Sequence, residues 1–502
     1  MIQRITVLGG GSAGFLSALS IKARLPQLDV TILRSPDIGI IGVGEGTTIS
    51  VPDHLHCNLN IDAGELNRSV KATWKLGIKF LWGPRPYFNY CFSPQFTGKY
   101  DELAKPSGFY ADVGIEFADQ TSALMTLDKA FARDRSGGPD LTRNHAAYHL
   151  ENADFVTYLE AKTLQRGIRV VDDTVDSVEQ EDDGIVALLC RSGGRVQADL
   201  WIDCSGFSSF LLGKALKVPF VSFRRSLVCD RAMVGGWERG ADEVIKPYTT
   251  AETMNSGWCW QIEHDHRINR GYVYSSPFVS DDAAEAEFRR KNPKVGPTRV
   301  VRFVSGYYER AWEKNVVAIG NSAGFVEPLE STSLFAICDQ AWALAQSLVE
   351  ADLDPGSAIV DAYNKFCGQT WESIRGFLAL HYKFNTRLET PFWQACQQET
   401  DLGDQAQEYV SYFQENGPSL LWINTLIQGR DAFGPEGWIT MLVGQDVHYR
   451  RRYVPSEAEQ RVWKKIQAGN WAVCANGIGV AEMSDLVRAP DWRFPKDFFR
   501  TR

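Results

Sequence analysis

The chain has 502 residues, of which 44% are hydrophobic and 12% aromatic, so it can bury one large composite core or two coupled ones. Its formal net charge of −9 argues against nucleic acid or an anionic membrane as the main partner. No apolar run approaches the roughly 20 residues needed to span a bilayer, and the N-terminus lacks the layout of a secretory signal. We therefore expect a cytoplasmic protein.

Ten cysteines are scattered along the chain, and none forms a Cys-x-x-Cys pair. This spacing indicates neither a zinc site nor a disulfide framework. We expect the cysteines to be small buried side chains, and we expect no metal.

The first chemically informative segment is a glycine-rich turn between a predicted strand and a predicted helix. Residues 5–8 have strand character, residues 15–19 have helix character, and between them stands Gly9-Gly10-Gly11-Ser12-Ala13-Gly14. The first glycine of such a turn permits a tight bend, the second lets the backbone approach a pyrophosphate, and the third lets helix pack on strand. The pattern predicts a dinucleotide site.

The second predicted strand ends at Arg34 and lacks the acidic residue that commonly holds a ribose. An arginine at this point can indicate NADP. A further glycine turn near Gly320, however, favours a cofactor long enough to cross the domain, which fits FAD better.

The next loop, residues 39–48, has too many glycines to be only a connection. Its apolar residues Ile40, Ile41 and Val43 favour burial, so we expect backbone laid against a ligand rather than a flexible surface loop.

Between residues 60 and 210 the patterns predict two helices and a strand. Asn67 to Phe80 is helix-like, residues 82–110 are aromatic and rich in proline and glycine, and Asn152 to Arg166 is the second helix. A strand then ends in Asp203-Cys204-Ser205-Gly206, which again suits a cofactor domain.

Trp258 and Trp260 share one face if their segment is a strand, because side chains two residues apart point the same way. Two stacked tryptophans of an ordinary core would produce the same pattern. For His264 and His266, just beyond them, an exposed strand edge is favoured over a pair of ligands.

The stretch from Gly320 to Ser333 joins a glycine turn to a carboxylate and three hydroxyl side chains. Residues 316–319 have strand character, and residues 334–344 are helix-like. A helix that starts here would direct the amide N–H groups of Thr332 and Ser333 at an anion. The alternative is an ordinary connection with a helix cap at Ser331 or Thr332.

From about residue 350, strand signals fade and long amphipathic patterns with many tryptophans and tyrosines take over. We expect a cofactor module over residues 1–350, with an insertion at about 60–150, and a mainly helical substrate-binding subdomain over 351–502.

These segments resemble the flavin-dependent halogenases of the tryptophan-halogenase family, over essentially the whole chain. The shared motifs are the Gly9 to Gly14 turn, the Gly42 to Thr47 strap, Lys79 within residues 75–80, residues 147–150, residues 203–207, residues 258–262, residues 320–333, residues 381–385 and residues 390–393. One motif departs from the family pattern WxWxIP, because Glu263 stands in place of the proline.

The resemblance implies an α/β fold: an FAD-binding module like those of glutathione reductase and hydroxybenzoate hydroxylase, with a mainly helical C-terminal substrate subdomain. It also implies that FADH2 from a separate NAD(P)H-dependent flavin reductase, O2, and chloride or bromide give hypohalous acid. This oxidant would reach Lys79 through an internal tunnel, at whose far end Glu330 would meet Lys79. The tryptophans Trp258 and Trp260 would lie near the flavin.

Lys79 can serve this chemistry in two protonation states. Its ammonium can polarise hypohalous acid, whereas its neutral amine, which requires burial to lower the pKa, could carry the halogen. Lys75 is expected to be an ordinary solvated charge. Glu330 would orient the oxidant or accept the proton that the arene loses, with Ser331 in support.

The remaining roles also come from the resemblance. The backbone amides of Thr332 and Ser333 would bind the halide, although glycine is common in the family at the position of Ser333. The expected cofactor contacts are Gly9, Gly11, Ser12, Ala13, Gly14, Gly42, Val43, Gly44, Glu45, Gly46, Thr47, Val175, Gly320, Asn321, Gly324 and Leu334.

The expected substrate is a free, electron-rich, indole-like arene, because the family branches that use tethered substrates usually lack the carboxylate that Glu330 supplies. A homodimer is expected by analogy. The alternatives are an FAD-dependent aromatic monooxygenase, which would hydroxylate without halide, and a non-catalytic flavin-binding protein.

Overall fold

The computed structural model describes residues 1–39, 42, 44–92, 103–105, 114–142, 145–419, 425–426 and 431–500. They form two compact units, each assembled from three stretches of the chain. Unit 1 comprises Met1–Asp62, Leu150–Phe223 and Phe303–Glu372, and unit 2 comprises Ala63–His149, Arg224–Arg302 and Ser373–Arg502. The expected division near residue 350, between a cofactor module and a substrate-binding subdomain, is defined by what each part binds, and it stays a prediction.

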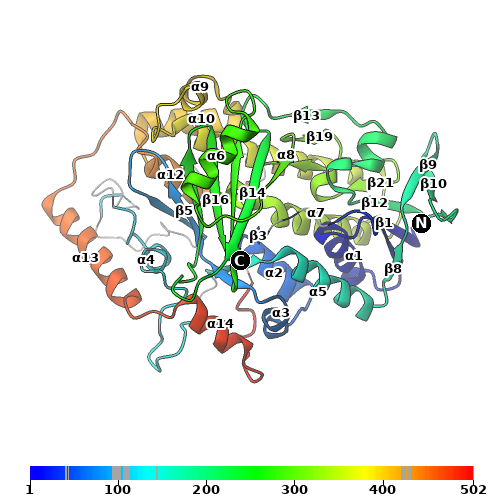
Figure 1. Ribbon diagram of the computed structural model, residues 1–502, viewed down its shortest axis with the longest axis horizontal. Coiled ribbons are helices and arrows are strands. Elements are labelled where there is room, and N and C mark those ends of the chain that lie inside the picture. The colour runs from blue at the N-terminus through cyan, green and yellow to red at the C-terminus, as the bar shows by residue number, and fades with distance from the viewer. Residues whose placement is uncertain are drawn as a thin grey trace. The chain divides into compact units, whose positions relative to one another are not determined.

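Unit 1 is built on a six-stranded sheet with the order β20-β21-β12-β1-β2-β8. All neighbouring strands in it are parallel except the edge strand β20. The helices α1 and α7 pack against each other beside this sheet (Figure 1). The elements are β1 (Arg4–Leu8), α1 (Ser12–Arg24), β2 (Asp29–Arg34), β8 (Arg169–Asp172), β12 (Leu200–Asp203), β20 (Trp312–Glu313), β21 (Val316–Ala318) and α7 (Thr332–Glu350).

The rest of unit 1 contains two small antiparallel sheets, with the orders β11-β10-β9 and β13-β19-β22. Their strands are β9 (Val175–Glu181), β10 (Gly184–Cys190), β11 (Arg195–Val196), β13 (Phe220–Ser222), β19 (Gly306–Tyr308) and β22 (Gly324–Phe325). Unit 1 also contains β3 (Glu45–Gly46), α2 (Ser50–Asp53) and α5 (Asn152–Gln165). The predicted strands and the helix from Asn152 are confirmed.

Unit 2 is built on a seven-stranded sheet with the order β18-β14-β17-β16-β15-β5-β6. Only the β15–β5 pair within this sheet is parallel. The helix α6 packs on β14 and β17 through Ala284 and Phe288. The strands are β5 (Gly77–Leu81), β6 (Phe88–Cys91), β14 (Arg231–Glu238), β15 (Thr249–Met254), β16 (Gly257–Glu263), β17 (Arg267–Tyr274) and β18 (Arg299–Arg302), and α6 is Asp281–Lys291.

The helix predicted from Asn67 to Phe80 is wrong. The helix α3 (Ala63–Val70) ends early, Lys71 takes a left-handed φ of 51°, and the chain continues as β4 (Thr73–Lys75) and then β5. Strand pairing overrides the local pattern, because β4 pairs with β7 (Ala147–Leu150) and β5 pairs with β15. Lys75 is fully buried in β4 rather than solvated, with its ammonium 5.0 Å from the centre of the Phe92 ring.

The C-terminal part is helical where the structure describes it, as the pattern predicts. The remaining helices are α4 (Gln120–Thr126), α8 (Ser357–Phe384), α9 (Pro391–Glu399), α10 (Gly403–Asn416), α12 (Gly434–Gly444), α13 (Glu457–Cys474) and α14 (Val480–Arg488). Within the described part of the chain, no helix has the length and apolar character needed to cross a membrane.

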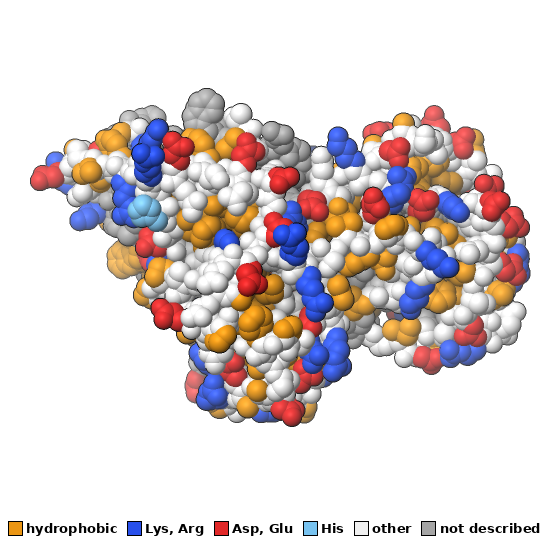
Figure 2. All heavy atoms as spheres, turned by 90° about the horizontal axis from the view of Figure 1, so that it is seen from above, with side chains coloured by type: hydrophobic (Ala, Val, Ile, Leu, Met, Phe, Trp, Pro, Cys, Tyr) orange, Lys and Arg blue, Asp and Glu red, His pale blue; other side chains and the backbone are white. Residues whose placement is uncertain are grey.

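The cysteines are free thiols, and all except the half-buried Cys57 are buried, as expected. On the face drawn in Figure 2, acidic and basic side chains are interspersed, and no broad surface of a single sign is visible.

Candidate active site

The parallel sheet of unit 1 brings three glycine-containing turns to one edge. The pairing register aligns Leu8, Asp203 and Ala318, which are the last residues of β1, β12 and β21. Backbone hydrogen bonds continue beyond the strands, from Cys204 N to Leu8 O at 2.9 Å and from Ile319 N to Asp203 O at 3.0 Å. Segments more than 100 residues apart therefore form one floor at the carboxyl ends of the strands, where α/β sheets bind ligands.

The glycines of the first turn differ in what surrounds them. A Cβ on Gly9, whose φ is +129°, would lie 2.2 Å from Cys204 O, and a Cβ on Gly14 would lie 1.9 Å from Gly9 O. A Cβ on Gly11 would meet nothing within 4 Å. Gly9 and Gly14 thus permit the strand–helix packing, while Gly11 leaves the backbone open to a ligand.

The start of α1 also suits an anion. Its N-cap is Gly11, which supplies no side-chain capping hydrogen bond, and the first turn contains no acidic residue. The positive end of the helix dipole and its amide N–H groups fit a pyrophosphate at this point. Ser12 and Ala13 begin the helix, and a Cβ on Gly320 would lie 3.3 Å from that of Ala13. The residues predicted to hold FAD therefore include a cradle of the right chemistry.

Two charged residues near this floor are occupied within the protein. Arg34 donates to Glu160 at 2.7 Å and to Asp172 at 2.6 Å, and these hydrogen bonds raise the pKa of its guanidinium. Asp203 is fully buried and accepts hydrogen bonds from the backbone N–H groups of Ser205, Leu211 and Leu212. Both side chains hold local structure, so Arg34 gives no support for an NADP phosphate.

The strap of residues 42–47 is described except for Val43, which lies outside the described residues. A Cβ on Gly42 would lie 1.6 Å from Nδ2 of Asn152, and Gly44 has a φ of +113°. The φ of Gly44 favours glycine, whereas a side chain at position 42 would require the Asn152 side chain to move. Glu45 and Gly46 form β3, and Thr47 is fully buried. Val175 begins β9 in a separate sheet of unit 1.

The second glycine turn starts with Gly320, whose φ is +68° and whose N–H donates to Gln340 at 2.9 Å. Asn321 is half-buried, and Gly324 packs against Tyr307, where a Cβ would come within 2.7 Å of the ring-bearing Cβ. Leu334 lies buried in the first turn of α7.

Glu330, Ser331 and the halide candidates follow this turn, just before and at the start of α7. Glu330 is 1% exposed and ends a short 3-10 helix, Pro328–Glu330. Ser331 has a left-handed φ of 57° and precedes α7 without a side-chain capping hydrogen bond. Thr332 and Ser333 are the first helical residues of α7, and neither has a positive φ. Serine in place of the family's glycine therefore causes no backbone strain.

In unit 2, Lys79 lies in the middle of β5 with a strand on each side. It pairs with Thr250 of the parallel strand β15 and with Asn89 of the antiparallel strand β6. Its side chain is half-buried, and burial lowers the pKa of its ammonium to about 8. Lys79 belongs to unit 2 and Glu330 to unit 1, so their expected meeting stays a prediction.

Two tyrosines and a carboxylate surround the end of the Lys79 side chain. Its Nζ donates to Tyr248 Oη at 2.9 Å, and Tyr248 in turn donates to Asp128 Oδ1 at 2.7 Å. The ammonium lies 4.0 Å from the ring centre of Tyr248 and 4.8 Å from that of Tyr87. Such cation–π contacts stabilise the charged form of lysine.

Trp258 and Trp260 are both buried on β16, with ring centres 6.0 Å apart. The register places Trp260, Ala251 and Phe80 on one face of the sheet, and Gln261, Thr250 and Lys79 on the other. The shared face predicted for the tryptophans is confirmed, and it is opposite to that of Lys79. The contact with flavin stays a prediction.

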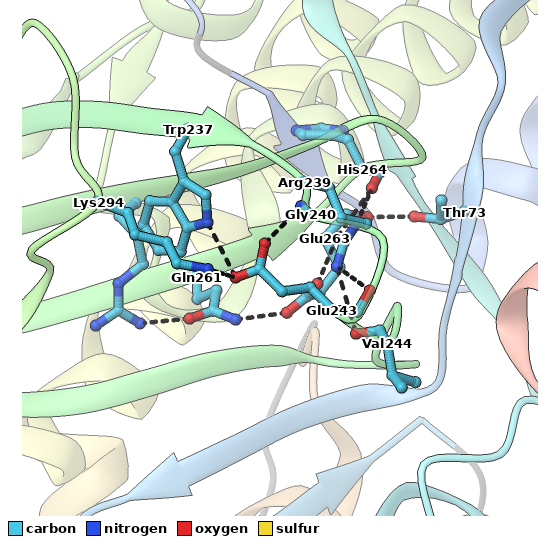
Figure 3. Close-up of polar contacts among 11 residues, drawn as sticks. Thr73, Trp237, Arg239, Gly240, Glu243, Val244, Gln261, Glu263, His264 and Lys294 are labelled. Atoms are coloured by element: carbon cyan, nitrogen blue, oxygen red, sulfur yellow. Dashed lines mark hydrogen bonds and ion pairs between the residues drawn. The ribbon is translucent and has the colours of Figure 1, made fainter.

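Glu263, the departure from the family motif, forms a buried ion pair (Figure 3). Arg239 Nη2 lies 2.6 Å from its Oε2, and the two side chains are 7% and 1% exposed. Gln261 donates to the other carboxylate oxygen at 2.5 Å. His264, expected at an exposed edge, is instead buried, which lowers its pKa to about 3, whereas His266 is exposed as expected.

Sequence reasoning missed Tyr248, Asp128 and Arg239. The first two lie 169 and about 50 residues from Lys79, and neither stands in a motif. For Arg239 the available signal was Glu263, because a carboxylate buried in a strand requires a cationic partner.

Comparisons with known proteins agree with this arrangement. The profile of the tryptophan halogenase family matches residues 4–459. The tryptophan 7-halogenase RebH of Lentzea aerocolonigenes is 31% identical over 82% of this chain and 82% of its own. The tryptophan 7-halogenase KtzQ of Kutzneria sp. (strain 744) is 32% identical over 83% and 82%.

The chain belongs to the tryptophan halogenase family.

Solved structures of this family share its fold. MibH, a lanthipeptide tryptophan 5-halogenase, superposes with a TM-score of 0.86 at 37% identity, over 96% of this chain and 93% of its own. BrvH, a flavin-dependent halogenase from Brevundimonas sp. BAL3, gives 0.85 at 26% identity, over 97% and 99%. The predicted fold class is confirmed, and the protein is an enzyme of the flavin-dependent halogenase class, which halogenates arenes.

Proposed function

We propose that this halogenase uses FADH2, O2 and chloride or bromide to halogenate an electron-rich, indole-like arene, with Lys79 receiving the hypohalous acid. The observation that carries the proposal is the setting of Lys79. A half-buried lysine with a pKa of about 8 is mainly ammonium at neutral pH, with roughly a tenth present as the neutral amine, whereas an ordinary lysine has almost none. It can therefore either donate a hydrogen bond to the oxidant or accept the halogen.

The cofactor would bind in unit 1. The open backbone at Gly11 and the N-terminus of α1 fit its pyrophosphate, and the turn from Gly320 to Gly324 would lie under its ring system. Reduced flavin bound there would, together with O2, supply the two-electron oxidation of halide to hypohalous acid. A separate NAD(P)H-dependent reductase would deliver it in reduced form, and a homodimer is compatible with the scheme.

The chain's own residues would bind the halide and move protons. The amides of Thr332 and Ser333 open α7 and are oriented for an anion. Glu330 is buried one residue before the left-handed Ser331, and it would accept the proton released when the arene regains aromaticity.

The substrate has two candidate forms that share one chemistry. Relatives are described as acting on tryptophan or, for KtzR of Kutzneria sp. (strain 744), on 7-chloro-L-tryptophan, and MibH is described as acting on a lanthipeptide. We propose a free indole-like arene, and a peptide-borne tryptophan is the form that the same experiment must include.

The test is mass spectrometry of assays containing FAD, a flavin reductase, NADH and bromide or chloride. The substrate panel should contain tryptophan, indoles, phenols and a tryptophan-containing peptide. We expect a monohalogenated product from wild type and at least a 100-fold loss in Lys79→Ala, with flavin oxidation retained. Hydroxylated products without halide would instead indicate a monooxygenase.

A matched control separates the role of Lys79 from charge alone. Lys383 is a half-buried lysine of the same unit whose Nζ donates to the carbonyl oxygen of Gln398 at 3.1 Å, and Lys383→Ala should leave product formation unchanged. Equal product from Lys79→Ala and Lys383→Ala would overturn the proposed role.

A further inference from the structure

We propose that Tyr248 and Asp128 are positioning residues that fix the direction of the Lys79 Nζ and supply the negative charge that favours its ammonium form. The inference deepens the proposed function, because it concerns how the lysine that receives the oxidant is prepared. It rests on a continuous hydrogen-bonded chain of three side chains, of which Lys79 and Asp128 come from the first stretch of unit 2 and Tyr248 from the second.

The direction of each hydrogen bond is set by chemistry. A tyrosine hydroxyl has one proton and accepts through its lone pairs. Because that proton of Tyr248 is donated to Asp128 at 2.7 Å, its oxygen can only accept from Lys79, at 2.9 Å. Tyr248 thus engages one N–H of Lys79 in either protonation state, and a longer contact joins the same Nζ to the carbonyl oxygen of Met125 at 3.5 Å.

The two strands beside Lys79 place these partners. Thr250 of β15 pairs with Lys79, and Tyr248 directly precedes this strand, where its hydroxyl reaches the Lys79 Nζ. Asn89 of β6 pairs with Lys79 on the other side, and its amide donates to Ser122 O at 3.1 Å and so holds α4. Asp128 follows α4 with a left-handed φ of 55°.

The segment that leads to Tyr248 is fastened by the buried ion pair of Figure 3. Arg239, paired with Glu263, donates to the carbonyl oxygens of Glu243 and Val244, both at 3.3 Å. Closer to Tyr248, the carbonyl of Pro247 accepts from Leu76 N at 2.7 Å. The buried ion pair therefore limits the movement of the hydroxyl that Lys79 contacts.

The charges around Lys79 act in opposite directions. Burial is the main cause that lowers its pKa to about 8, Asp128 raises it, and Lys246 lowers it. The other facing groups are Tyr87 and Tyr248, and burial raises the pKa of both phenols, so they stay protonated at neutral pH. Glu263 acts on Tyr248 in the same direction as Asp128. Removing the charge of Asp128 must therefore lower the pKa of Lys79.

The experiment measures that pKa directly. Lysines of the full chain are reductively methylated with 13C-formaldehyde, and the Lys79 resonance is assigned by its loss in Lys79→Arg and titrated by NMR. Asp128→Asn keeps an acceptor for Tyr248 but removes the charge, and Tyr248→Phe removes the link. We expect the Lys79 midpoint to fall by about one pH unit in each variant.

The matched control is Tyr272→Phe. Tyr272 is a buried tyrosine of the same sheet whose hydroxyl also donates to a carboxylate, that of Glu287, at 3.0 Å. Its loss should leave the Lys79 midpoint unchanged. An unchanged midpoint in Asp128→Asn and Tyr248→Phe would overturn the inference, and if Tyr248→Phe fails to fold, Asp128→Asn alone decides.

The titration needs no turnover, so it stands or falls separately from the proposed halogenation. Where product is formed, the pH at which the rate is half-maximal should move down together with the Lys79 midpoint in Asp128→Asn. A lower rate without a shift of the pH profile would indicate a merely structural role and contradict the inference.

Discussion

At the scale of single residues, the stability of the fold depends strongly on keeping both partners of the buried ion pair between Arg239 and Glu263. Arg239→Met would leave the Glu263 carboxylate, which is 1% exposed, without its cationic partner. Removing one partner of a buried ion pair costs about 3–5 kcal/mol. We expect a loss of that size in the free energy of unfolding, measured with urea.

An exposed ion pair provides the comparison. Arg195 and Glu179 form a pair at 2.7 Å with side chains 43% and 42% exposed, and Arg195→Met should cost less than about 1 kcal/mol. Equal losses in the two variants would show that the buried pair contributes no more than a solvated one.

Individual residues were predicted from sequence to the extent that their environment is local. The roles of Gly9 and Gly14 in the turn and in helix packing follow from the strand–turn–helix pattern. The burial of Lys75 and His264 could not be predicted, because a charged or polar side chain is usually solvated and its burial depends on distant partners. The contact of Lys79 with Tyr248 could not be predicted for the same reason, because the two residues are 169 positions apart in the sequence.

At the scale of elements, the turn between β1 and α1 separates packing from binding. Gly14→Ala should destabilise the unit, since the new Cβ would lie 1.9 Å from Gly9 O. Gly11→Ala meets no atom within 4 Å, so it should lower the melting temperature far less than Gly14→Ala does and weaken FAD binding about tenfold or more. Thermal unfolding without cofactor and a flavin fluorescence titration measure the two effects.

The outcome for Gly11→Ala decides whether the cradle holds the cofactor. Unchanged FAD affinity in a stable Gly11→Ala protein would place the pyrophosphate elsewhere.

Element prediction succeeded where strand, turn and helix are adjacent in sequence and failed where a strand has a remote partner. The helix from Asn152 and the strand before Gly320 are examples of success. Residues 73–81 look helical in isolation but form β4 and β5, because their hydrogen-bond partners come from residues 147–149 and 249–252.

At the scale of the whole molecule, buried histidines predict acid sensitivity. Burial lowers the pKa of His54 and of His56 to about 4, and it lowers that of His149 well below 6.5. Between pH 6.5 and 4 the unfolded chain binds protons that the folded chain does not, so stability falls as the pH falls. His54 alone accounts for about 3 kcal/mol across this window.

Urea unfolding at a series of pH values tests this expectation. His54→Gln should reduce the slope of the unfolding free energy against pH between 6.5 and 4, and His266→Gln, at an exposed position, is the matched control. Identical slopes in wild type and His54→Gln would contradict it.

The interleaving of the two units has a consequence for synthesis of the protein. Each unit is assembled from an early, a middle and a late stretch of the chain. The sheet that contains Lys79 therefore cannot be completed until residues 224–302 have been synthesised, and the helices of its unit cannot pack until the residues from 373 onward have been synthesised. A growing chain on the ribosome therefore exposes unpaired strand edges for most of its translation, when aggregation competes with folding. A single cut anywhere between residues 64 and 371 would divide both units, so neither fragment would contain a complete unit.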